Sequence, residues 1–404
     1  MVALLLFLAL LSPGGSSSAP VVALPSLPDT TREIGVSLDV NPLALYSSTY
    51  GFGIEGDVEV SGLTPESELA LDVRLSQRLQ RGRLSFYTAD PYRAPLFGFA
   101  ALRGRNSSAF RFYGLGPSSD RDNKLQLTLT SADAEARVGW YPLGHSGLLL
   151  QPMARVFWDQ LRGVEEDGDS ALVHLDTMSL NHLNALLDES RTGVLVGAAV
   201  ASDSRDNPWL PRRGFLAEVE AGRFFSLDGS GLQYNRVVGQ LYGFAPAGPV
   251  VLFGRAVAAS VRAADGEMLP FYYLPILDKD LLTGFPSNRL FARDVLALSA
   301  GLRAPLAQVR GFYRIDGLLL GSLANAYDDL PDQFTPRVSF EEDVVVDEDG
   351  NVPLRPAAAV GLGLVNVRQH RMRFSFLMGF SPEGSLFSSY RVAFDLRDAD
   401  ALFR

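Results

Sequence analysis

The sequence predicts an all-β protein, built as a transmembrane antiparallel β-barrel of about 16 strands. Three observations lead to this fold class. Apolar and polar residues alternate with a period of two, as in strands with one apolar and one polar face. Many of these segments run for about ten residues, the length of a tilted strand that crosses a bilayer. The longest connections between the segments also fall on one side of the sheet.

The composition of the 404 residues fits this fold and excludes several functions. The chain has 38 Gly, 25 Phe and 13 Tyr, which suit turns, strands and an apolar interface. A net charge of -10 argues against a nucleic-acid partner, because phosphate binding needs a concentrated basic face. With no cysteine and only four histidines, the chain has no thiolate and few metal ligands. We therefore expect no nucleic-acid binding, no metal and no cofactor.

The first residues are typical of an export signal. Residues 2–11, "VALLLFLALL", are apolar but too short to span a bilayer as a helix, and a run of small polar residues follows. No Lys or Arg precedes the apolar run, so a buried strand is the alternative. We expect a signal peptide over residues 1–23, a linker or short plug over residues 24–49, and the barrel over residues 50–404.

Each alternating segment has an apolar face that we expect to contact lipid and a polar face that we expect to line the lumen. The clearest apolar faces are Phe52, Ile54, Val58 and Val60; Leu69, Leu71, Val73 and Leu75; Leu125, Leu127 and Leu129; Met372, Phe374, Phe376, Met378 and Phe380; and Tyr390, Val392, Phe394 and Leu396. A soluble β-sandwich also alternates, so the pattern alone is neutral. Segment length favours the barrel, because strands of soluble sheets average about five or six residues.

Sixteen segments are expected to be strands. They are residues 50–61, 67–79, 82–89, 95–112, 124–131, 134–142, 147–159, 192–202, 213–226, 231–244, 249–262, 294–306, 309–322, 356–367, 371–381 and 387–397. If the first strand leaves the periplasm, the three longest connections (near 160–191, 263–293 and 323–355) lie outside the cell, as in bacterial outer-membrane barrels. Two turns on the inner side, 113–123 and 203–212, are longer than that rule expects.

Five segments carry motifs of a known family. They are "FYGLGPSSDRDN" (112–123), "DSRDNPWLPRRG" (203–214), "LTGFPSNRLFARD" (282–294), "RIDGLLLGS" (314–322) and "VGLGLVNV" (360–367). In this order they resemble an aromatic-Gly-x-Gly segment, an Asp-x-Arg-Asp-Asn turn that closes with Pro-x-x-Gly, the sixth external loop, an Asp-Gly strand and a glycine-rich strand. The chain thus resembles the superfamily of outer-membrane assembly and two-partner-secretion barrels, also called the bacterial surface antigen family, over roughly residues 50–400.

The resemblance implies that the long sixth external loop folds back into the lumen. In the family, an Arg of the Arg-Gly-aromatic tip pairs with the Asp of the Asp-Gly strand. Here Gly284 and Phe285 match the tip and Asp316 matches the acid, but Thr283 stands in place of the Arg. A Thr hydroxyl cannot supply the bidentate pair of a guanidinium. Our hypothesis is that another cation serves Asp316, the alternative being that Asp316 is simply hydrated. The candidates are Arg289, Arg293 and Arg303.

The resemblance also implies a periplasmic turn motif and a seam. The turn motif consists of Asp203, Arg205, Asp206, Pro211 and Gly214. The seam is the junction of the first and last strands, which in the family is a weakly paired lateral gate. The residues expected to face each other there are Glu55, Asp57 and Glu59 on one side and Arg391 and Arg397 on the other. Exposed pairs are worth about 0–1 kcal/mol each, enough to bias closure; the alternative is that they are solvated channel walls.

The function implied by this resemblance is the insertion or translocation of polypeptides, or of lipid, at the outer membrane of a Gram-negative cell. The family's periplasmic substrate-docking (POTRA) domains are not recognisable in the sequence, so docking would depend on a separate periplasmic protein. The first alternative is a passive pore or structural barrel. The second is a membrane-embedded hydrolase, which is disfavoured because no cluster of Ser, His and acid is apparent. We expect an integral outer-membrane protein that is not an enzyme.

Overall fold

A computed structural model describes the protein over residues 37–47, 50–63, 67–92, 94–144, 147–164, 177–264, 268–279, 281–309, 311–341, 346–368 and 371–390. The signal peptide expected over residues 1–23 lies outside the described residues, as do residues 24–36 and 48–49 of the expected linker or plug. No helix in the described ranges is long and apolar enough to cross a membrane.

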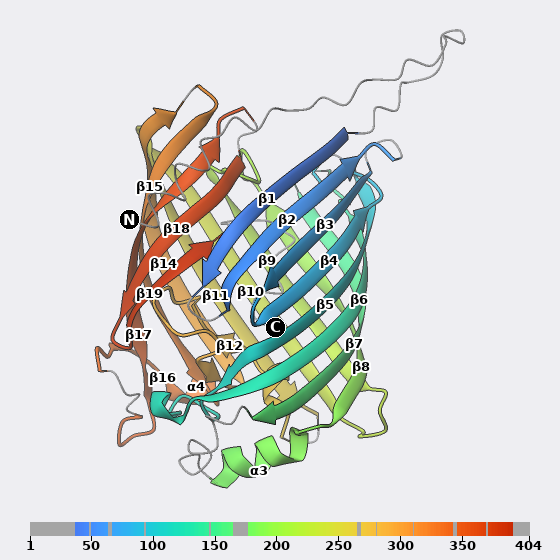
Figure 1. Ribbon diagram of the computed structural model, residues 1–404, viewed down its shortest axis with the longest axis vertical. Coiled ribbons are helices and arrows are strands. Elements are labelled where there is room, and N and C mark those ends of the chain that lie inside the picture. The colour runs from blue at the N-terminus through green and yellow to red at the C-terminus, as the bar shows by residue number, and fades with distance from the viewer. Residues whose placement is uncertain are drawn as a thin grey trace. The chain divides into compact units, whose positions relative to one another are not determined.

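The described part of the chain is nearly all β, and its long strands form an antiparallel meander that curves into a barrel (Figure 1). The strands are β1 (Ser37–Ser47), β2 (Gly51–Ser61), β3 (Glu68–Ser76), β4 (Leu79–Tyr87), β5 (Leu96–Phe112), β6 (Leu125–Trp140), β7 (Leu148–Val164), β8 (Ser190–Asp203), β9 (Gly214–Ser226), β10 (Gln233–Ala247), β11 (Val250–Ala263), β14 (Asp294–Val309), β15 (Tyr313–Tyr327), β17 (Val352–Asn366), β18 (Arg371–Ser381) and β19 (Gly384–Tyr390). Each one pairs with the next.

The remaining elements lie in the connections at one end of the barrel, which we call the long-loop end. They are η1 (Arg121–Asn123), α3 (Thr177–Leu186), η3 (Phe271–Tyr273), β12 (Ile276–Leu277), β13 (Leu290–Phe291), α4 (Leu330–Gln333) and β16 (Phe334–Val338). Figure 1 shows α3 and α4 together at this end. The opposite end, which we call the short-turn end, carries the connections that follow the even-numbered strands β2 to β10 and the strands β14 and β17.

The predicted barrel of about 16 strands is confirmed, but two assignments along the chain were wrong. Residues 37–47, placed in the linker or plug, form β1 and pair with β2. Residues 124–131 and 134–142, placed in two strands, form the single strand β6, whose Asp133 points inward to arginine partners rather than marking a turn. The two errors cancel in the count. They also move the connection 113–124 to the long-loop end, where its length is ordinary.

The outer face of the wall is apolar, as predicted. Phe52, Val196 and Phe376 are 64%, 52% and 41% exposed, on three separate strands. Such side chains suit contact with lipid. One predicted outward face was wrong and another was wrong in part. Leu125, Leu127 and Leu129 are buried and face inward. Met372 is also buried. The register between β17 and β18 shifts there, so that Arg373 pairs with no residue of β17 and the Met372 side chain turns inward.

The inner face carries charged side chains that pair across neighbouring strands. Glu135 on β6 pairs with Arg103 on β5 and with Arg137, while Arg137 lies 3.1 Å from Glu220 on β9. Glu220 in turn pairs with Arg236 on β10. Because most of these side chains are shielded from bulk solvent, each charge needs such a partner. The network fixes the lumen-facing side of the wall from β5 to β10.

Candidate functional site

The connection between β11 and β14 is the sixth at the long-loop end, and it folds into the barrel as the resemblance predicted. Its short strands β12 and β13 pair with each other, through Ile276 with Phe291 and Leu277 with Leu290. The side chains of Leu282 and Phe285 are completely buried. We call residues 264–293 the lumen loop.

The first half of the lumen loop packs an aromatic cluster against the inner face of the wall. The ring of Phe271 lies 4.3 Å from that of Phe112 on β5, and the ring of Tyr273 lies 5.2 Å from that of Phe224 on β9. The hydroxyl of Tyr273 donates to Asp159 on β7 at 3.1 Å. Leu125, Leu127 and Leu129 belong to the same cluster, which explains why they face inward. We call this cluster the aromatic plug, because it fills the barrel near its long-loop end.

Helix α3 closes the aromatic plug from the side of the β7–β8 connection. Its Leu183 and Leu186 are buried in the plug, and the Oγ of Ser179 accepts a hydrogen bond from the backbone N–H of Leu115 at 3.1 Å. The ring of His182 meets that of Phe271 at 6.3 Å and has a hydrogen bond with the Leu269 backbone. Burial lowers the pKa of His182 to about 4, so the imidazole is neutral at pH 7.

The tip of the lumen loop, Thr283–Phe285, lies against β18. Gly284 has a φ of +114°, and a Cβ there would come within 2.9 Å of the Phe380 backbone. A Cβ on Gly379 would come within 2.5 Å of the Gly284 nitrogen, so two glycines are needed for this approach. The Oγ of Ser381 donates to the Gly284 carbonyl at 3.1 Å. The tip is therefore held on the second-to-last strand of the barrel.

Asp316, the acid of the Asp-Gly strand, has its own partners on the wall. Arg314 donates to both carboxylate oxygens of Asp316, at 2.5 and 2.8 Å. The Nε of Arg303 lies 3.7 Å from the same carboxylate. Of the three candidate cations, Arg303 is thus near Asp316. The closest partner of Asp316 is Arg314, which stands two residues before it on β15. The side chain of Arg293 is exposed.

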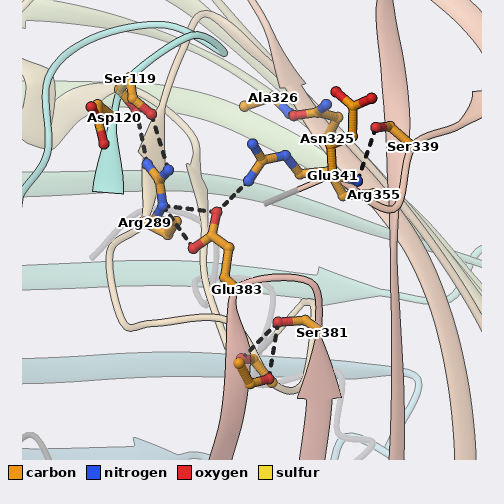
Figure 2. A network of polar contacts seen from close by, with 12 residues as sticks. Ser119, Asp120, Arg289, Asn325, Ala326, Ser339, Glu341, Arg355, Ser381 and Glu383 are labelled. Carbon is orange, nitrogen blue, oxygen red and sulfur yellow. Dashed lines mark hydrogen bonds and ion pairs between the residues drawn. The ribbon is translucent and has the colours of Figure 1, made fainter. Parts of the chain in front are cut away.

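Arg289 of the lumen loop enters a different ion pair, shown in Figure 2. Its Nε donates to both carboxylate oxygens of Glu383, at 3.0 and 2.8 Å, and its two terminal nitrogens donate to the Oγ and the carbonyl of Ser119, each at 3.0 Å. Arg355 on β17 pairs with the same Glu383. Arg289 and Glu383 are both buried. We call these four residues, Ser119, Arg289, Arg355 and Glu383, the latch.

The latch joins the lumen loop to the turn between β18 and β19, next to the last described strand. Sequence reasoning considered Arg289 but missed its partners. Glu383 stands in the turn "SPEG", where an exposed acid is the ordinary expectation, so no sequence pattern marked it. Ser119 lies within the segment 112–123 that resembles a family motif, and that resemblance was the available signal.

The turn motif folds on itself between β8 and β9. The guanidinium of Arg205 grips Asp203 through two hydrogen bonds of 2.9 and 2.7 Å. An Oδ1 of Asp206 accepts the backbone N–H of Arg212 at 2.9 Å. Gly214 has a φ of +98°, and a Cβ there would lie 2.3 Å from the Ser204 carbonyl. The carbonyl of Pro211 accepts a hydrogen bond of 2.6 Å from Arg303 on β14.

The seam lies one strand away from its predicted position, because β1 precedes β2. The strands β1 and β19 lie next to each other. In the described residues 37–47 and 384–390, β1 pairs with β2 and β19 pairs with β18, but β1 and β19 do not pair with each other. Glu55, Asp57 and Glu59 are on β2 and thus face β1 and β3, and Glu55 lies 3.9 Å from Arg74 on β3. Arg391 and Arg397 are outside the described residues.

The site consists of paired charges and packed rings. Within the described ranges, no group of three or more His, Asp or Glu side chains could hold a metal ion. The arrangement holds one wall of the barrel against the lumen loop.

Comparison with known proteins places this fold. No protein-family model matches the sequence. The structure of BamA from Haemophilus ducreyi lacking POTRA domains 1-3 matches with a TM-score of 0.57 at 13% identity, over 88% of this chain and 69% of that one. CdiB from Escherichia coli matches with a TM-score of 0.53 at 10% identity, over 92% of this chain and 62% of that one, less than two thirds of its length. The chain therefore has the β-barrel fold of BamA and CdiB, the fold that its sequence motifs predicted.

Proposed function

We propose that this protein is an integral outer-membrane barrel that inserts or translocates polypeptides, with the seam beside β19 as the part that opens. The observation that carries the proposal is the latch. A buried loop inside the barrel holds the end of β18 through Gly284, and it holds the β18–β19 turn through the pair of Arg289 with Glu383. A passive wall would not need an internal loop fastened beside its seam.

The shared fold supports this proposal. BamA and CdiB are barrels of polypeptide assembly and secretion, so the same role is the first one to test for this chain. Fold alone is a weak warrant for function, and the latch is the feature that makes the proposal specific. The long connections support an orientation with the long-loop end outside the cell and the short-turn end in the periplasm. The partners are then outer-membrane lipid, polypeptide substrates and a separate periplasmic docking protein.

The aromatic plug disfavours the alternative of an open passive pore. Side chains from β5 to β10 and from the lumen loop meet there with little exposed surface. A steady large conductance would require the plug to leave the barrel. Within the part of the chain that the structure describes, no observation favours the hydrolase alternative.

The test compares purified protein in two assays. In liposomes, the protein is expected to speed the folding of an unfolded outer-membrane barrel, and Arg289→Met is expected to change that rate at least several-fold. Arg337→Met is the matched control, because the Arg337 side chain is 79% exposed. In planar bilayers, the wild type is expected to be mostly closed. A steady open conductance together with no effect on folding would refute the proposal in favour of the passive pore.

A further inference from the structure

The turn between β8 and β9 reaches beyond its own strands to a distant part of the wall. Its Leu210 is buried in a cluster formed by Leu318 on β15, Val365 on β17, and Met372 and Leu377 on β18. In the order of the barrel wall, β10 and β11 lie between this turn and β14, β15, β17 and β18. The contact therefore bridges the lumen rather than joining neighbours.

The cluster that receives Leu210 is shaped for it by two local features, and we call its four wall residues the socket. The register shift in β18 turns Met372 inward, as described above. Gly363 on β17 leaves the room that Met372 occupies, because a Cβ at Gly363 would lie 2.9 Å from the Met372 methyl carbon. A side chain at position 363 would push Met372 out of place.

A second contact fastens the same turn to β14. Arg303 donates to the Pro211 carbonyl at 2.6 Å, one residue after Leu210, and its Nε faces Asp316 at 3.7 Å. The next residue, Arg212, donates to the Gly248 carbonyl at 3.3 Å. Two polar contacts thus hold the turn directly after the buried Leu210.

The turn is also ordered from within, so that little conformational entropy is lost when Leu210 enters the socket. Asn207 Oδ1 accepts the backbone N–H groups of Trp209 and Leu210, at 2.8 and 2.9 Å. Asp206 accepts that of Arg212, and Gly214 provides the positive φ that closes the turn. A turn that is ordered in this way can hold two parts of the wall in fixed positions relative to each other.

We infer that the β8–β9 turn is a strut that braces the seam-side wall at the short-turn end. The latch holds this wall at the long-loop end, through the turn that follows β18, and the strut holds β18 itself near its start. Leu210 is the positioning residue, and among the described strands only β19 lies between the braced strand and the seam. If β18 moves when the seam opens, which rests on the proposed function, Leu210 has to leave the socket.

The test compares matched leucine substitutions in the full barrel. Leu210→Ser removes the buried side chain, while Leu143→Ser changes a leucine of the β6–β7 turn at the same end that is 78% exposed. Backbone hydrogen exchange in residues 371–381 is expected to become at least tenfold faster in Leu210→Ser and to stay unchanged in Leu143→Ser. Equal exchange in all three proteins would overturn the strut.

A second variant keeps the inference testable if Leu210→Ser does not fold. Arg303→Gln removes the bond to Pro211 from the opposite wall and leaves the turn sequence intact, so exchange in residues 371–381 is again expected to rise. Wild-type exchange in a folded Arg303→Gln would count against the strut. The folding-acceleration assay on the same samples separates the two proposals. A wild type that does not accelerate folding refutes the function, while the exchange difference still decides the strut.

Discussion

Replacing Glu383 by Gln is expected to destabilise the barrel strongly, and the cost is expected to fall when Arg289 is also replaced. The Glu383 carboxylate is buried between the guanidinium groups of Arg289 and Arg355. Removing it leaves two buried cations facing a neutral amide. Breaking a buried pair by removing one partner costs about 3–5 kcal/mol, and Glu383→Gln should lie near the upper end because two cations lose their partner.

The double variant Arg289→Met/Glu383→Gln tests the electrostatic origin of this cost. It leaves one guanidinium that has lost the Glu383 carboxylate instead of two, so Arg289→Met should cost less in the Glu383→Gln background than in the wild type. Coupling energies between such contacting residues are about 0.5–3 kcal/mol. Urea titration of the barrel in lipid, followed by fluorescence of its three tryptophans, measures all four proteins. The exposed pair Arg337–Asp347 supplies the control, and Arg337→Met should leave the midpoint unchanged.

Two results would contradict a buried Arg289–Glu383 pair. If the costs of Arg289→Met and Glu383→Gln simply add, the two side chains do not interact in the folded barrel. If Glu383→Gln is as stable as the wild type, the carboxylate is not buried between two cations.

Three further predictions concern other parts of the barrel. The pKa of His182 is lowered to about 4 from an ordinary value near 6.5, so the docking of α3 is most stable above pH 6.5 and is expected to weaken as the pH falls toward 4. The rate of proteolysis of α3 should therefore increase between pH 7 and pH 4.5. A rate that does not depend on pH, or an unchanged pH dependence in His182→Gln, would contradict this. Gly284→Ala forces a β-carbon against the Phe380 backbone at a φ of +114° and should cost about 1–3 kcal/mol of stability in the urea titration. Gly311→Ala is the control, because Gly311 has a φ of +70° but open space around it. It shows how much of that cost is backbone strain alone. Val196→Arg places a charge on the lipid-facing side and should cost about 2–4 kcal/mol of stability if residue 196 lies near the bilayer midplane. Val196→Leu should leave the stability unchanged. An Arg variant as stable as the Leu variant would place this residue outside the membrane.

The wall of the barrel could be predicted from sequence because its chemistry repeats. Apolar and polar side chains alternate in β2, because every second residue faces lipid and the others face the lumen. The lengths of the strands fit a wall that crosses a membrane. The strand count came out right although β6 was divided into 124–131 and 134–142 and β1 was missed, since residues 37–47 were placed in a linker or plug. Position along the barrel was harder to predict. Leu125, Leu127 and Leu129 alternate in the usual way, but near the plug the apolar partner is inside.

The latch and the strut could be predicted only in part, because each joins residues that are far apart in the chain. Arg289 and Glu383 are separated by 94 positions, and neither lies in a pattern that names the other. The turn motif was recognised from Asp203 to Gly214, but its reach to Met372 depends on a register shift in β18 that no sequence period reveals. Such contacts arise from the curvature of the whole sheet.

The aromatic plug has a consequence for how this protein is made. Phe271 and Phe291 are enclosed by rings and aliphatic side chains that come from β5 to β11 and from α3. A closed barrel leaves no opening through which a folded segment of that size could later enter. The chain must therefore gather its strands around residues 264–293 while the sheet is still open, and the meeting of β1 with β19 is then the last event of assembly. Mutations that loosen the plug should accordingly act first on the yield of closed barrels, before they affect anything the closed barrel does.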